Sequence, residues 1–128
     1  MYNDIVIKRV LFEDLKPLSA LKKESVDFHK TPNTTYLGAF IEGNLVGCVG
    51  FAIMKNTLRY KTDCVIYRYR NNGIYSELFR RRDEICSKID VKKITAFCTS
   101  KSLYMYLKNG FKIERKLKNS ITFVSKTL

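Results

Sequence analysis

The apolar pattern of this chain changes its period at residues 71–73, Asn-Asn-Gly, and this change limits the folds that the chain can adopt. Residues 58–67, just before it, predict a strand. After it, apolar residues recur every three or four positions and predict an amphipathic helix over 74–89. Residues 93–98 predict a further strand. This order favours a βαβ unit, in which the two strands are parallel.

The preceding residues predict an opening strand, a helical segment and an antiparallel meander. Residues 5–7 form a short β-branched run, and residues 11–24 carry leucines at helical spacing, although Pro17 interrupts them. A two-residue hairpin turn, Gly43-Asn44, joins the first two strands of the meander. The meander consists of three predicted strands, at 35–42, 45–54 and 58–67.

The C-terminal part predicts one more helix and a hairpin. The helix begins after Thr99 or Ser100 and ends at Gly110, which suits a left-handed cap. Residues 111–117 and 121–126 predict the hairpin. We therefore expect a single α/β (α+β) domain over residues 1–128, with a mixed central sheet flanked by helices. An antiparallel meander comes first, followed by the βαβ unit and the hairpin, and ligands favour the place where the pairing changes direction.

Positive charge is concentrated in the second half of the chain. Residues 65–128 carry fifteen basic and five acidic side chains, against nine and seven in residues 1–64, and the whole chain has a net charge of +12. Such a field favours an anionic partner, namely a phosphate-bearing cofactor, a nucleic acid or an acidic protein, and disfavours a free polyamine. It is equally compatible with a surface that only aids solubility. The run Arg80-Arg81-Arg82 is either a solvated helix face or a contact for such a partner.

The cysteine and histidine pattern predicts no metal site. The four cysteines, at 48, 64, 86 and 98, form no close pairs, and His29 is the only histidine. We expect reduced, buried thiols and a cytoplasmic protein. Neither an apolar signal segment nor an apolar run long enough to span a membrane occurs in the sequence, so we expect no membrane partner.

The junction between strand and helix at residues 66–76 predicts an anion site. Backbone N–H groups at a helix N-terminus have no intrahelical partner, and the helix dipole is positive there. Gly73 allows a ligand to approach the backbone closely, and Arg68 and Arg70 add positive charge. A phosphate group would be favoured at this position.

The segment from Val65 to Tyr75 resembles the central motif of the GNAT N-acetyltransferases, in which a strand valine is followed by R/Q-x-x-G-x-G/A at the start of a helix. Tyr75 departs from this motif because the family has Gly or Ala there, and its side chain would either point outward or narrow the site. The resemblance implies acetyl-CoA as acyl donor, with the loop amides on its pyrophosphate and the strand backbone near the valine polarising the thioester carbonyl. The implied cofactor-binding residues are Val65, Ile66, Tyr67, Arg70, Asn71, Asn72, Gly73, Ile74 and Tyr75.

A second segment, residues 103–111, resembles the family's "lYeklGF" sequence and implies a role for Tyr106. In the family, the matching tyrosine often protonates the departing CoA thiolate; without the resemblance, Tyr106 would be read as a core residue. The family's usual glutamate base is replaced by Arg59, which cannot serve. Asp63 lies four residues further on, which predicts the same side of the strand, and we take it as the candidate base. Glu42 and His29 are weaker alternatives.

The sequence thus predicts an acyl-CoA-dependent N-acetyltransferase whose amine acceptor is not identified. The basic charge makes an anionic or nucleic-acid-linked acceptor more plausible than a polyamine. The alternative is a non-catalytic module of the same fold that binds nucleic acid or an acidic protein through its basic C-terminal half. A homodimer formed through residues 121–126 is compatible with either function.

Overall fold

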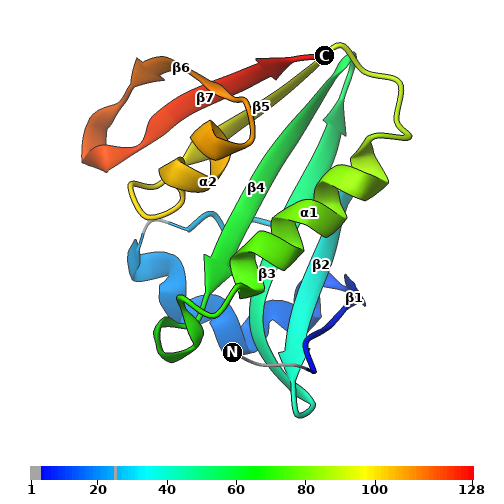
Figure 1. Cartoon of the computed structure of the whole chain (residues 1–128), viewed down its shortest axis with the longest axis vertical. Helices are drawn as coiled ribbons and strands as arrows, with labels where there is room; N and C mark the ends of the chain where they lie inside the picture. Colours follow the sequence, from blue (N-terminus) through cyan, green and yellow to red (C-terminus); the bar gives the residue numbers. More distant parts are fainter. Residues whose placement is uncertain (1–3, 25) are drawn as a thin grey trace.

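The computed structural model describes residues 4–24 and 26–128, which form one seven-stranded sheet (Figure 1). The strand order is β1-β2-β3-β4-β5-β7-β6, and β4 and β5 are the parallel pair. The mixed α/β fold predicted from the sequence is therefore confirmed. The strands are β1 (Val6–Val10), β2 (Thr34–Ile41), β3 (Asn44–Met54), β4 (Thr57–Val65), β5 (Lys93–Cys98), β6 (Lys112–Lys116) and β7 (Thr122–Thr127).

The helices cover both faces of this sheet. Helix α1 packs on β2, β3 and β4 through Ile74 and Leu78, whereas the leucines of the N-terminal 3-10 segment η1 pack on the opposite face with Tyr36 and Cys48 (Figure 1). Pro17 lies inside η1, where it lacks the N–H that a regular α-helix would use. The helical segments are η1 (Phe12–Glu24), η2 (Tyr67–Tyr69), α1 (Ile74–Cys86), α2 (Leu103–Lys108) and η3 (Lys118–Ser120).

Several predicted boundaries differ from the structure, and the opening strand, predicted at residues 5–7, extends to Val10. Strand β4 ends at Val65, and the residues after it form the turn η2. Helix α1 ends at Cys86, three residues earlier than predicted, and α2 begins at Leu103, after a turn that starts at Thr99. The predicted domain range includes residues 1–3 and 25, which lie outside the described residues.

Strands β4 and β5 separate halfway along their length. Their pairing runs from Thr57 opposite Lys93 to Tyr60 opposite Ala96, and no further. On its other edge β4 continues beside β3 as far as Val65. The last part of β4 therefore has a strand partner on one edge only, and Figure 1 shows the two strands diverging below this point.

Strand β7 lies between β5 and β6 and is antiparallel to both. Edge pairing between two copies through residues 121–126 would require a free strand edge, and β7 has none because both of its edges are paired. The free edge on this side of the sheet belongs to β6. Any dimer formed by edge pairing here would have to use β6 instead.

All four cysteines are buried and none forms a disulfide, as the sequence predicted for reduced thiols. Cys48 and Cys64 lie directly opposite each other on β3 and β4, with their sulfurs 3.6 Å apart. Among the described residues, the helices are too short or too polar to cross a bilayer.

Candidate active site

Two hollows meet where β4 and β5 separate. The loop hollow, of about 640 Å³, is lined by the end of β4, the loop at residues 70–76 and the start of α2. The sheet hollow, of about 530 Å³, lies over β4 and β5 and reaches Pro32 and Ile121. The residues that line both hollows are Val26, Asp63, Thr99 and Ser102. A molecule in one hollow would therefore meet a molecule in the other at these residues.

The residues of the predicted anion site line the loop hollow. Helix α1 begins directly after Gly73, whose φ of 80° is left-handed, and Asn71 also has a positive φ of 64°. The first helical bond runs from the Glu77 amide to the Gly73 carbonyl at 3.1 Å, so the amides before it have no helical acceptor. The Asn72 side chain donates to the carbonyls of Tyr69 and Arg70, which holds the loop in this conformation.

Arg70 supports the loop through contacts within the protein. Its Nε donates to the Val65 carbonyl at 2.8 Å, and its terminal nitrogen pairs with Glu24 at 2.8 Å. Lys101, at the start of the α2 turn, pairs with the same carboxylate at 2.8 Å. Arg70 and Lys101 therefore share the single carboxylate of Glu24, so this wall of the loop hollow keeps a net positive charge.

The structure changes the role predicted for Ile66. Its amide donates to the Val46 carbonyl at 2.8 Å and its carbonyl accepts from the Tyr69 amide, so neither group is available to a ligand. Successive residues of an antiparallel strand point their backbone groups to opposite sides. The amide of Val65 therefore faces the side that β5 has left, so of these two predicted residues only Val65 turns its amide to this edge.

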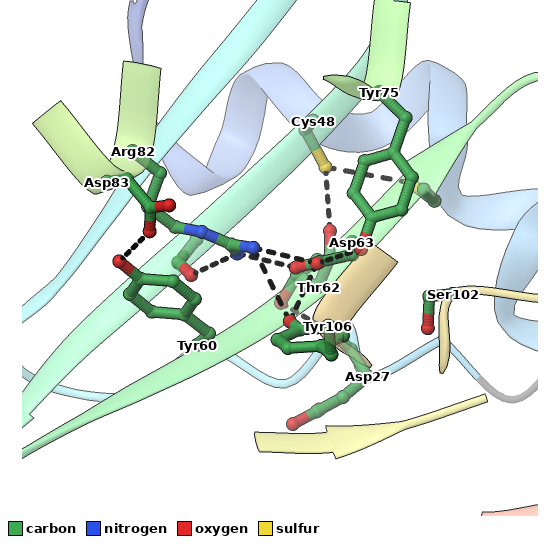
Figure 2. Close-up of polar contacts among 12 residues, drawn as sticks. Asp27, Cys48, Tyr60, Thr62, Asp63, Tyr75, Arg82, Asp83, Ser102 and Tyr106 are labelled. Atoms are coloured by element: carbon green, nitrogen blue, oxygen red, sulfur yellow. Dashed lines mark hydrogen bonds and ion pairs between the residues drawn. The ribbon is translucent and has the colours of Figure 1, made fainter. Parts of the chain in front are cut away.

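Tyr75 points neither outward nor across the cofactor site. Its phenol turns inward and donates to the carboxylate of Asp63 (Figure 2). Burial, and then the negative charge of Asp63, raises the pKa of Tyr75 well above its ordinary value. The bulky side chain that departs from the family motif is thus part of a buried hydrogen-bond network.

Asp63 does not face the same side of β4 as Arg59, contrary to the prediction. At a β-bulge, Thr62 and Asp63 of β4 together oppose the single residue Val49 of β3. Thr62 takes a φ of 61° there, and its hydroxyl donates to the Asp27 carbonyl at 2.7 Å. The extra residue reverses the alternation, so Asp63 faces α1.

Asp63 lies at the centre of a buried ion pair with α1. Arg82 donates to its two oxygens at 2.6 and 2.9 Å, and the side chains are 0% and 6% exposed. The phenol of Tyr106 donates to the carboxylate at 2.7 Å (Figure 2). Burial alone would lower the pKa of Arg82, but the charge of Asp63 reverses this effect and raises it. Asp63 is therefore held by one buried cation and two phenols.

Tyr106, the predicted acid, is fully buried and lines the sheet hollow. Its ring packs against those of Phe79 and Phe111, with centroids 5.1 and 5.0 Å apart. Burial, and then the charge of Asp63, raises the pKa of Tyr106 well above its ordinary value. The phenol therefore keeps its proton at neutral pH, and this proton points at Asp63.

The arginine run on α1 does not form a basic patch. Arg82 is buried, because its spacing from Leu78 and Cys86 puts it on the apolar face of the helix. Arg80 is exposed but pairs with Glu77 and Glu84 on the same helix. Two of the three arginines are thus paired within the protein and Arg81 is half-buried, so the contact with nucleic acid or acidic protein considered for this run stays a prediction.

Sequence reasoning missed most of the sheet hollow. Arg59 and Lys61 of β4 line it together with Asp27, which comes from a distant part of the sequence, so the three residues form no motif together. The alternative bases, Glu42 and His29, line neither of the two hollows described. No group of three or more His, Cys, Asp or Glu side chains able to hold a metal occurs in the part of the chain that the structure describes.

Comparison with known proteins identifies the family. The model of the acetyltransferase (GNAT) family matches residues 7–111. A search of the curated proteins found no match. The fold is similar to that of the PaiA N-acetyltransferase of Thermoplasma acidophilum in complex with coenzyme A, with a TM-score of 0.77 and 19% identity over 98% of this chain and 99% of that chain.

Two further solved structures have a similar fold. The IAA acetyltransferase of Bacillus cereus ATCC 14579 has a TM-score of 0.76 at 17% identity, over 98% of this chain and 100% of that chain. The N-acetylglutamate synthase of Neisseria gonorrhoeae, complexed with coenzyme A and L-arginine, has a TM-score of 0.74 at 14% identity, over 97% of this chain and 33% of that chain. Since the family model covers most of the sequence and the fold agrees with it, the chain belongs to the GNAT acetyltransferase family.

Proposed function

We propose that the chain transfers the acetyl group of acetyl-CoA to an amine, with the CoA in the loop hollow and the amine in the sheet hollow. The observation that carries this proposal is that the two hollows meet at Asp63, Thr99 and Ser102, beside the unpaired edge of β4. A donor and an acceptor bound on the two sides would bring thioester and amine together, so that the amine attacks directly.

The cofactor would be held by backbone groups at two places. The free amides at Gly73 and the start of α1 would bind the pyrophosphate, supported by the positive helix end and by Lys101. The Val65 amide would donate to the thioester carbonyl and stabilise the oxyanion that forms during attack. CoA would thereby occupy the edge of β4 that β5 leaves unpaired.

Two side chains are proposed for proton transfer. Tyr106 would protonate the departing thiolate, since its phenol stays protonated at neutral pH. Asp63 stays a predicted base: its position at both hollows favours the role, whereas its ion pair with Arg82 opposes it. An acceptor that arrives as a neutral amine would need no such base.

The test is calorimetric titration of acetyl-CoA into the protein and into a Gly73→Asp variant. The new carboxylate would repel the pyrophosphate and would strain a left-handed backbone position, so we expect micromolar binding to be lost. Gly43→Asp is the matched control, because Gly43 has a φ of 81° in the β2–β3 turn and has open space around it. Absence of binding to the unaltered protein would overturn the proposal, as would full binding by the Gly73→Asp variant.

A further inference from the structure

One of the positively charged side chains that line the sheet hollow lacks a negatively charged partner in the described part of the chain. The charged side chains of this hollow are two carboxylates, Asp27 and Asp63, and two cations, Arg59 and Lys61. Asp63 is neutralised by Arg82, which lies behind the wall of the hollow. Asp27 lies 3.5 Å from the Lys61 ammonium. Among the residues that the structure describes, Arg59 is thus the cation of this hollow without an ion-pair partner.

Lys61 has no donor to spare for a ligand. Its ammonium is held by the His29 carbonyl at 3.3 Å and the Thr31 hydroxyl at 3.2 Å, in addition to Asp27. The residue is only 9% exposed. Its three protons therefore all point at protein acceptors.

Arg59 is fixed in place but has most of its donors unused. Its Nε donates to the Thr95 hydroxyl at 2.9 Å, and its guanidinium carbon lies 4.8 Å from the centre of the Phe97 ring. These contacts orient the planar group, and for its two terminal nitrogens the described residues offer no hydrogen-bond acceptor. Burial lowers the pKa of Arg59, so the site disfavours the bare cation and an anion would relieve it.

We infer that Arg59 binds a carboxylate of the acceptor, and that the substrate is therefore a small amine that also carries a carboxylate. This inference rests on the proposed function. A fixed guanidinium with two free terminal nitrogens matches a carboxylate in two parallel hydrogen bonds. The hollow, of about 530 Å³, has the size of a small-molecule site.

The strand spacing sets the length of this acceptor. The guanidinium lies over Phe97, and the junction of the two hollows lies at Thr99, two residues further along the chain. Two extended residues span about 7 Å. The reacting amine and the carboxylate are therefore separated by a chain of several carbons, which an α-amino group beside its own carboxylate does not provide.

Three amines of equal chain length test this inference: 6-aminohexanoate, 1-aminohexane and 1,6-diaminohexane, each at saturating acetyl-CoA with release of the CoA thiol as the readout. We expect kcat/KM to be higher for 6-aminohexanoate than for 1-aminohexane by on the order of 100-fold, as charged hydrogen bonds provide. Arg59→Met should remove this preference, chiefly through KM. Arg59→Glu should transfer the preference to 1,6-diaminohexane.

Arg115→Met is the matched control, because Arg115 also stacks on a strand phenylalanine, Phe123, but lines neither of the two hollows. It should keep the preference. Equal turnover of all three amines, or a preference that survives Arg59→Met, would overturn the inference. A protein that binds acetyl-CoA but acetylates none of the three amines would also overturn the inference. The donor half of the proposed function would then still stand. If the unaltered protein does not bind acetyl-CoA, the proposed function itself is overturned instead.

Discussion

At the residue scale, one oxygen of Asp63 accepts from two phenols that differ in their access to the hollows. Tyr75 and Tyr106 both donate to Oδ2, but Tyr75 lines the loop hollow and Tyr106 lines the sheet hollow. Both protons are held tightly because burial and the adjacent charge raise both pKa values. Replacing each tyrosine in turn by phenylalanine therefore distinguishes a phenol that donates its proton in catalysis from one that only holds the carboxylate in place.

Tyr106→Phe should lower the rate of acetyl transfer by about 100-fold, the usual contribution of a positioned general acid, and should leave acetyl-CoA affinity unchanged. Tyr75→Phe removes the other phenol from the same oxygen and should keep most of the turnover. The rates are compared with the best amine of the series above, and affinity is measured by calorimetry. Equal losses in both variants would show that the phenols act only by holding Asp63, and a fully active Tyr106→Phe protein would exclude Tyr106 as the acid.

The conformation of the loop before α1 could be predicted from sequence because its causes are local. Gly73 adopts a left-handed backbone conformation and a helix begins directly after it, as the residues themselves require. The orientation of Asp63 could not be predicted, because it depends on a bulge that Thr62 makes against β3. Nor could the unbalanced charge of Arg59 be predicted, since it depends on which neighbours pair with the other charges.

At the element scale, α1 carries two neighbouring arginines in opposite environments. Arg82 is buried and holds Asp63, the Gly50 carbonyl and the face of Tyr60, 3.9 Å from the ring centre. Arg80 is exposed on the other face and pairs only with glutamates of its own helix. A helix can thus use two residues of one type, two positions apart, for a structural and a solvent role.

Arg82→Met should destabilise the fold by about 3–5 kcal/mol, because it leaves the carboxylate of Asp63 buried without a counter-charge. Arg80→Met is the matched control on the same helix and should change stability little, since exposed ion pairs contribute little. The measurement is the free energy of unfolding from urea titration of both variants. Similar losses in the two variants would contradict the distinction between the faces of α1.

Elements with a strong repeating pattern or a clear turn residue were predicted well. The β2–β3 hairpin and α1 follow from such local signals. Segment η1 was harder, because Pro17 removes a donor within an otherwise helical pattern and the segment forms 3-10 turns. The end of β4 was placed too late because the turn η2 begins with residues that also suit a strand.

At the scale of the whole molecule, three buried tyrosines link stability to alkaline pH. Burial is the main cause that raises the pKa of Tyr60, Tyr75 and Tyr106 above the ordinary value of about 10. Below about pH 10 both the folded and the unfolded protein keep these protons, and the contribution is constant. At higher pH the unfolded chain loses them while the folded protein keeps them, so the stability should fall as pH rises.

Urea titrations at pH 9, 10 and 11 measure this fall, and Tyr60→Phe isolates one group. Each tyrosine should add a slope of about 1.4 kcal/mol per pH unit once the unfolded form has ionised. The variant should therefore lose stability less steeply than the unaltered protein by about that amount. Lysines titrate in both proteins alike and cancel in the comparison. Identical slopes would mean that Tyr60 ionises as readily in the folded protein as in the unfolded chain.

The topology was predicted in part. The meander and the parallel βαβ unit follow from the order of the elements. The place of β7 between β5 and β6 does not, because either strand of a hairpin can pair with the edge of an existing sheet. Only long-range packing decides which strand joins β5. For this reason β7 offers no free edge for pairing, and a dimer through residues 121–126 stays a prediction.

The internal position of β7 also has a consequence for the order in which the sheet assembles. Strand β6 pairs with β7 alone, and β7 pairs with β5 as far as Thr127 opposite Lys93 (Figure 1). Until β7 has formed, one edge of β5 is exposed and β6 has no strand partner. An incomplete sheet of this kind is open to aggregation. The partly folded chain therefore remains open to wrong pairing until residues 122–127 lie between β5 and β6.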